Sequence, residues 1–170
     1  METVFEHYVV QRLRREAPPE IRITTQERLY HLFEESPSGK AFPLRPDIVL
    51  RRNGRATEGP VIADTKWKLL CGDPSKNYGI STGDMYQMYA YQKRYAARTI
   101  LLVYPRHGAL ASIDSAPPVY QTPGDSHIRI VFFDLDHPSE SVNQLLSAAT
   151  ATEQTFSTLP LSAKQSQCIG

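Results

Sequence analysis

Two short apolar segments with an Asn-Gly turn between them constrain the fold of this chain more than any other feature. Residues 47–52 and 61–67 are rich in Ile, Val and Leu, and Asn53-Gly54 lies between them. Asn-Gly between two β-prone segments is a strong local signal for a hairpin. We therefore expect two neighbouring strands, and their pairing brings together the two aspartates that they carry, Asp47 and Asp64.

Hydrophobic periodicity predicts further elements on both sides of this hairpin. Helices are expected over residues 2–16, from Ser81 or Thr82 to about residue 98, and over residues 139–149; strands are expected over residues 21–33, 99–104 and 128–133. Residues 72–79 and 106–126 are rich in Gly, Pro and polar residues, so both are expected to be connections. The order of elements predicts an α/β fold with a mixed central sheet flanked by helices.

Length and composition fit one compact domain. The chain has 170 residues, of which 41% are hydrophobic, so a core can form without disulfides or structural metals. We expect a domain over residues 1–150 and a flexible tail over residues 151–170, where Ser, Thr, Gln and Ala predominate. Cys71 and Cys168 match no zinc spacing, and no apolar run approaches the about 20 residues of a membrane helix. A soluble cytoplasmic protein is the expectation.

The paired aspartates suit a hard divalent cation. Magnesium prefers oxygen ligands and keeps several waters, so one or two carboxylates suffice to hold it. Asp47 and Asp64 are the expected ligands, and the Thr65 backbone carbonyl can add a further oxygen. Such a cation offsets the negative charge that gathers when a phosphodiester is hydrolysed.

Lys66 completes this constellation because residues two apart on a strand face the same side. Its ammonium group could position a water molecule or stabilise a developing oxyanion. Asp-X-Lys alone is more often a strand-end aspartate followed by a solvated lysine. The placement of each motif within its own apolar strand favours the catalytic interpretation.

Two other groups are candidates with an ordinary alternative. Glu6 lies beside the apolar stripe of the first helix and could reach the site, or it could be a solvated glutamate. Gln87 and Tyr91 are four residues apart and share a helix face, where they could hold Lys66, a water or a phosphate. Packing of amphipathic tyrosines against the sheet explains that pair as well.

Several basic residues surround the two aspartates in sequence, although the net charge of the chain is only +1. Such groups suit the phosphates of a nucleic-acid backbone, and a solvated basic edge strand explains them equally well. The candidate DNA contacts are Arg45, Arg51, Arg52, Lys68 and Lys76.

Taken together, these motifs resemble a known family. Pro46-Asp47 followed by Asp64-Thr65-Lys66 resembles the PD-(D/E)XK nuclease superfamily, and the helix with Gln87 and Tyr91 looks like that of its RecB-like branch. More narrowly, the segments LRPDIVL, VIADTKWK and YGISTGDMYQMYAY are similar to the nuclease domain of McrC, the cleaving subunit of the McrBC restriction system specific for modified cytosine. The opening FEHYVVQRL matches the first helix of that family, whose glutamate corresponds to Glu6. The similarity covers about residues 4–105.

The resemblance implies a restriction-endonuclease-like core in αβββαβ order, magnesium at the acidic pair with manganese as a substitute, and cleavage of double-stranded DNA. It also implies a GTP-driven McrB-like AAA+ ring as partner and pairing of nuclease subunits. In the family a docking domain for the ring precedes the first helix, whereas this sequence begins on that helix. An isolated nuclease domain, a truncated relative and a stand-alone nuclease therefore all stay open, and nothing in the sequence reads methylation.

Two other functions remain as alternatives to a magnesium-dependent endonuclease of a restriction system. One is a stand-alone RecB-like exonuclease or repair nuclease. The other is a DNA-binding or assembly module with a catalytically silent site. The presence of every motif residue favours an enzyme.

Overall fold

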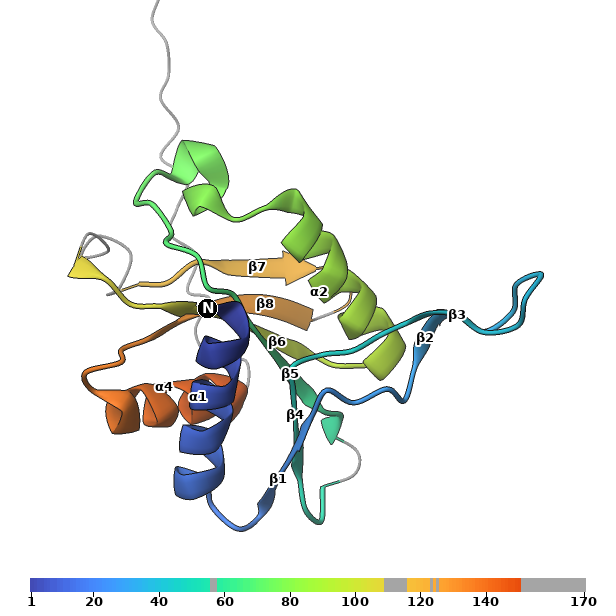
Figure 1. Ribbon diagram of the computed structural model, residues 1–170, viewed down its shortest axis with the longest axis horizontal. Coiled ribbons are helices and arrows are strands. Elements are labelled where there is room, and N and C mark those ends of the chain that lie inside the picture. Colours follow the sequence, from blue (N-terminus) through green and yellow to red (C-terminus); the bar gives the residue numbers. More distant parts are fainter. Residues whose placement is uncertain (56–57, 109–115, 123, 125, 151–170) are drawn as a thin grey trace, which may run out of the picture.

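A six-stranded mixed sheet forms the centre of the protein, as a computed structural model shows for residues 1–55, 58–108, 116–122, 124 and 126–150 (Figure 1). The strand order is β1-β4-β5-β6-β8-β7. The pairs β1–β4, β4–β5 and β7–β8 are antiparallel, whereas β5–β6 and β6–β8 are parallel. This arrangement confirms the predicted mixed sheet flanked by helices. Its strands are β1 (Ile21–Thr25), β4 (Ile48–Arg52), β5 (Val61–Thr65), β6 (Thr99–Pro105), β7 (Val119–Thr122) and β8 (Ser126–Phe133).

Helices cover both faces of this sheet. Helix α2 (Thr82–Tyr95) buries Met88, Tyr91 and Tyr95 against one face, while α1 (Glu2–Glu16) and α4 (Pro138–Thr150) cover the other. Strand β6 lies in the middle and is buried along its whole length, as expected for a parallel strand covered on both faces. Every second residue of β5 therefore faces α2, and the residues between them face α1 and α4.

The helices begin and end where local chemistry dictates. Helix α1 buries Phe5, Val9 and Leu13 as one stripe and ends just before Pro18-Pro19, which cannot continue a helix. The Ser81 hydroxyl accepts a hydrogen bond of 3.0 Å from the Asp84 backbone N–H and caps α2. The predicted helix over residues 2–16 is confirmed, and of the two predicted caps, Ser81 and Thr82, Ser81 is the one found. Helix α2 ends at Tyr95, earlier than the predicted end at about residue 98.

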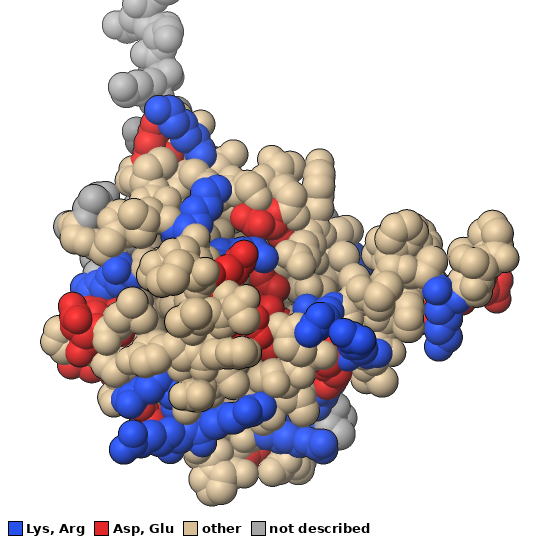
Figure 2. Space-filling view, viewed as in Figure 1, with Lys and Arg blue, Asp and Glu red and all other residues tan. Residues whose placement is uncertain are grey.

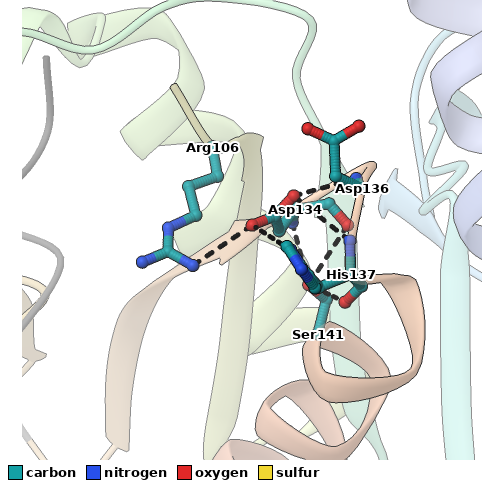
Figure 3. Close-up of polar contacts among 5 residues, drawn as sticks. All are labelled: Arg106, Asp134, Asp136, His137 and Ser141. Atoms are coloured by element: carbon teal, nitrogen blue, oxygen red, sulfur yellow. Dashed lines mark hydrogen bonds and ion pairs between the residues drawn. The ribbon is translucent and has the colours of Figure 1, made fainter. Parts of the chain in front are cut away.

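The junction between β8 and α4 is held by a cluster of polar contacts around Asp134 (Figure 3). Its Oδ1 atom accepts the backbone N–H groups of Asp136 and His137, and its Oδ2 atom lies 3.2 Å from the Arg106 guanidinium. The Asp134 backbone N–H donates to the Ser141 hydroxyl at 2.8 Å. These bonds fix the start of α4 to the ends of β6 and β8, so that α4 packs beside α1.

One prediction about the strands was wrong. Residues 21–33 were expected to form one strand, but they form β1 and, after a turn at Gln26, β2 (His31–Phe33). Strand β2 pairs with β3 (Ala41–Pro43) in a separate two-stranded sheet that projects from the body of the protein (Figure 1). Gln26 has a φ of 52°, a left-handed conformation that ends the strand and that glutamine rarely adopts.

The connections were also more ordered than expected. Strand β7 lies within the predicted connection over residues 106–126 and pairs with β8 at the edge of the sheet. A 3₁₀ segment, η2 (Pro74–Gly79), occupies most of the predicted loop over residues 72–79. The predicted flexible tail, residues 151–170, lies outside the described residues. None of the described helices combines the length and the apolar character needed to cross a bilayer.

An ion pair in the turn after β1 yields a prediction for the pH dependence of stability. Glu27 accepts two hydrogen bonds of 2.8 Å from Arg51 of β4, which lower the pKa of Glu27 below its ordinary 4.5. The pair therefore stabilises the fold at pH values above 4.5 and loses its effect as the pH falls through the lowered pKa. Glu27→Gln should reduce the free energy of unfolding by about 1 kcal/mol at pH 7, as urea denaturation would measure.

The difference between Glu27→Gln and the wild type should shrink as the pH is lowered to 3. The exposed Glu35 provides a matched control, since Glu35→Gln should leave stability unchanged at both pH values. A loss in Glu27→Gln that is equally large at pH 3 and pH 7 would show that the ion pair is not its cause.

Candidate functional site

The two aspartates singled out in the sequence lie side by side at one end of the sheet. Asp47 immediately precedes β4 and Asp64 lies within β5. The antiparallel register pairs Ile48 with Ala63, so Asp47 and Asp64 are the next residues opposite one another. Figure 2 shows acidic side chains gathered near the middle of the face that Figure 1 presents, with basic side chains close by.

Asp64 is a buried carboxylate paired with the predicted lysine. Its exposed fraction is 2%, and its Oδ2 atom lies 2.6 Å from the Nζ atom of Lys66. Lys66 follows β5 directly, and its backbone N–H donates to the Val103 carbonyl of β6 at 2.9 Å. This bond keeps the backbone of Lys66 in strand register. The side chains of Asp64 and Lys66 therefore lie on the same face of the sheet, the face that α2 covers.

The electrostatic environment of Asp64 makes it harder for this carboxyl group to lose its proton. Burial and the nearby charge of Asp47 raise the pKa of Asp64 to about 7, although Lys66 acts in the other direction. Burial alone would lower the pKa of Lys66, but the carboxylates of Asp64, Asp84 and Asp47 outweigh it and raise that pKa. The Oδ2 atom of Asp64 is buried, and the Lys66 ammonium group that faces it is its positive partner.

Helix α2 holds the lysine from the other side. Lys66 Nζ donates to Gln87 Oε1 at 3.1 Å, and Gln87 Nε2 donates to Tyr91 Oη at 2.9 Å. Tyr91 is 2% exposed, and burial raises the pKa of its phenol. The structure therefore brings the predicted Gln87 and Tyr91 together with Lys66, in a chain of bonds that fixes the position of the ammonium group.

Asp47 is held by groups from the α1 side of the sheet. The Thr65 backbone N–H and hydroxyl each donate to Asp47 Oδ2 at 2.8 Å. The Nε2 atom of Gln26 donates to Asp47 Oδ1 at 3.1 Å, and the same nitrogen donates to Glu6 Oε1 on α1. Both Asp47 oxygens are therefore oriented by donors, and Glu6 is connected to the site through Gln26.

Among the predicted carboxylate ligands of the metal, Asp47 is the one that has both of the others, Asp64 and Glu6, as neighbours in the site. Asp47 and Asp64 lie opposite each other, whereas the amide of Gln26 lies between Glu6 and Asp47. In the part of the chain that the structure describes, no three His, Cys, Asp or Glu side chains are grouped closely enough to form a ready-made metal site. The Thr65 side chain acts as a donor to Asp47, and the role predicted for its carbonyl stays a prediction.

Four of the five predicted DNA contacts fall into two groups at opposite ends of the hairpin. Arg45 and Lys68 are exposed and lie close in sequence to Asp47 and Lys66. Arg51 and Arg52 lie at the far end of β4, where Arg51 pairs with Glu27 and Arg52 with Glu58. They border a cavity of about 240 Å³, which is remote from the aspartates. Lys76 lies in η2, 3.7 Å from Asp73.

Sequence reasoning missed Gln26. It belongs to none of the recognised motifs, and its side chain reaches the site because the left-handed turn at this residue directs it back toward Asp47. A glutamine directly after a strand carries no signal of this kind.

Comparison with known proteins places the chain in context. A family model described as McrBC 5-methylcytosine restriction system component matches residues 1–105. Curated proteins gave no significant match. Among solved structures, a chain in the assembly of Thermococcus gammatolerans McrB AAA+ hexamers with bound McrC is similar, with a TM-score of 0.62 and 17% sequence identity. The match covers 86% of the present chain and 33% of that chain. At this sequence identity it shows that the two chains share a fold.

The bonds between Thr65 and Asp47 provide a test of this geometry. Thr65→Val preserves the shape of a side chain that is 1% exposed and keeps the backbone donor, but removes the hydroxyl. Because a hydrogen bond to a carboxylate is lost, the free energy of unfolding should fall by about 1 to 2 kcal/mol in urea denaturation. Thr65→Ser retains the hydroxyl and serves as the control. Equal stability of Thr65→Val and the wild type would mean that this bond is absent in solution.

Proposed function

The chain belongs to the family of McrBC 5-methylcytosine restriction system components, and we propose that it is a metal-dependent endonuclease that hydrolyses phosphodiester bonds in double-stranded DNA. The observation that carries this proposal is the buried Asp64 carboxylate. It lies opposite Asp47 and 2.6 Å from the Lys66 ammonium group, so two carboxylates and one ammonium group meet at one place in the sheet. Placing a buried carboxylate beside a second one is costly for the fold, and such arrangements are concentrated at functional sites.

The residues at the site fit a hard divalent cation. Asp47 and Asp64 would hold Mg²⁺ through carboxylate oxygens, with Glu6 and the Thr65 carbonyl as further ligands, and Mn²⁺ would substitute. When bound, the cation would offset the negative charge that gathers on the phosphate oxygens during hydrolysis. It would also offset the burial and the repulsion from Asp47 that together raise the pKa of Asp64.

Lys66 acts on the reacting groups from the α2 side. Its ammonium group is fixed by Asp64 and by the carbonyl oxygen of Gln87, which leaves a proton directed at neither partner. We assign to this donor the positioning of the attacking water or the stabilisation of the phosphate oxygens. Gln87 and Tyr91 then keep the lysine in place as charge develops.

DNA would approach over the exposed side chains next to the aspartates. Arg45 and Lys68 are suited to phosphate contacts because they are exposed and close to Asp47 and Lys66 in sequence. The similar solved structure holds McrB AAA+ hexamers with bound McrC. We propose that the protein acts in the cytoplasm with a GTP-driven, McrB-like AAA+ ring, and that pairing of nuclease subunits allows both strands to be cut.

Asp64→Asn tests the catalytic proposal. The substitution keeps the shape of the side chain but removes its charge, so cleavage of closed circular DNA in Mg²⁺ should fall by at least about 100-fold, while the fold persists. DNA binding should be retained, and it can be followed through the fluorescence of Trp67, the only tryptophan of the chain, which lies next to Lys66.

Asp136→Asn is the matched control, since Asp136 is exposed at the start of α4, and it should cleave as the wild type does. Cleavage by Asp64→Asn at the wild-type rate would overturn the proposal. Degradation of linear DNA with no opening of circular DNA would instead favour the exonuclease alternative.

The two groups of basic residues can be separated by the salt dependence of DNA binding. Arg45→Ala and Lys68→Ala should each weaken binding and reduce the slope of log affinity against log salt by about one. Arg52→Ala, at the far end of β4, should change neither quantity if DNA lies over the aspartates. Binding can be measured by anisotropy of a labelled duplex in EDTA. A larger effect for Arg52→Ala would place the DNA at the other end of the sheet.

A further inference from the structure

Gln26 connects two acidic side chains that come from different elements. Its Nε2 atom donates to Glu6 Oε1 of α1 and, at 3.1 Å, to Asp47 Oδ1 before β4. A primary amide has two N–H groups on one nitrogen, so it can donate to two carboxylates at the same time. Without such a donor, the two partly buried carboxylates would repel each other.

The backbone of Gln26 is fixed as firmly as its side chain. Its N–H donates to the Asp47 carbonyl at 3.1 Å and extends the β1–β4 pairing by one residue. Its φ of 52° lies in the left-handed region, which costs about 1 to 2 kcal/mol for a residue other than glycine. Unusual backbone conformations of this kind persist where the surrounding contacts require them, and they are concentrated at functional sites.

Deepening the function proposed above, we propose that Gln26 is a positioning residue that holds Asp47 and Glu6 ready for a divalent cation. Without a cation, the two amide N–H groups supply the hydrogen bonds that hold both carboxylates. Thr65 fixes the other Asp47 oxygen, so the carboxylate can rotate little about its bond. The cation then meets oriented ligands, and Glu6 is kept within reach of the aspartates although it comes from a different element.

Gln26→Glu is the most direct test because it keeps the size of the side chain and exchanges the donor for a third carboxylate. In EDTA this variant should melt at a lower temperature than the wild type. Adding Mn²⁺ should raise its melting temperature by more than it raises that of the wild type, because the cation takes over the role of the lost donor. Gln92→Glu is the control: Gln92 is buried and donates to the Thr122 hydroxyl at 2.8 Å, so its loss of stability should not respond to Mn²⁺.

Gln26→Asn provides a second test that does not depend on a destabilised variant. Asparagine adopts the left-handed backbone more readily than glutamine, but its amide is one methylene shorter and cannot span both carboxylates. Calorimetric titration should show Mn²⁺ affinity reduced by about tenfold or more, as is usual when residues that orient metal ligands are changed. The Mg²⁺ concentration for half-maximal cleavage should rise in parallel, with the rate at saturating Mg²⁺ largely restored.

The inference is overturned if Gln26→Glu melts as the wild type does in EDTA, if Mn²⁺ raises both melting temperatures equally, or if Gln26→Asn binds Mn²⁺ with wild-type affinity. A wild type that binds Mn²⁺ but cleaves no DNA would refute the nuclease function and leave these comparisons intact.

Discussion

The arrangement of this protein depends on one buried negative charge, that of Asp64 in β5. A carboxylate that is 2% exposed is costly unless a positive partner accompanies it, and Lys66 is placed by strand register to be that partner. The negative charge of Asp47, directly before the neighbouring strand β4, disfavours the charged form of Asp64. The three groups together form a site in which an additional positive charge is favourable, and this property links the fold to the proposed chemistry.

The sheet brings support to this site from both of its faces. Alternation along β5 turns Asp64 and Lys66 toward α2, where Gln87 and Tyr91 hold the ammonium group. Thr65 faces the other way and binds Asp47 on the side where α1 carries Glu6. Each helix therefore stabilises one part of the site, and the order of residues within a single strand decides which part that is.

Features encoded by neighbouring residues could be predicted from the sequence. The stripe of Phe5, Val9 and Leu13, the Ser81 cap and the Asn53-Gly54 hairpin all depend on local spacing, and the structure confirms each. The turn at Gln26 could not be predicted, because it depends on bonds to Asp47, which is far away in the sequence. Strand β7 pairs with nearby residues of β8, but its four residues lie in a segment rich in Gly, Pro and polar residues that predicts a connection. The positions of Arg51 and Arg52 could not be predicted either. Both are near Asp47 in sequence, but they lie at the far end of β4, so the length of this strand separates them from the aspartates. The functional roles of the site residues remain predictions.

Anomalous diffraction from crystals soaked in Mn²⁺ tests most directly whether Asp47 and Asp64 share one cation. We expect one strong peak in contact with carboxylate oxygens of both Asp47 and Asp64. Asp64→Asn crystals soaked in the same way should show that peak weakened or lost. A cation bound elsewhere in crystals of an active protein, or no peak between these side chains at a concentration that supports cleavage, would contradict this expectation.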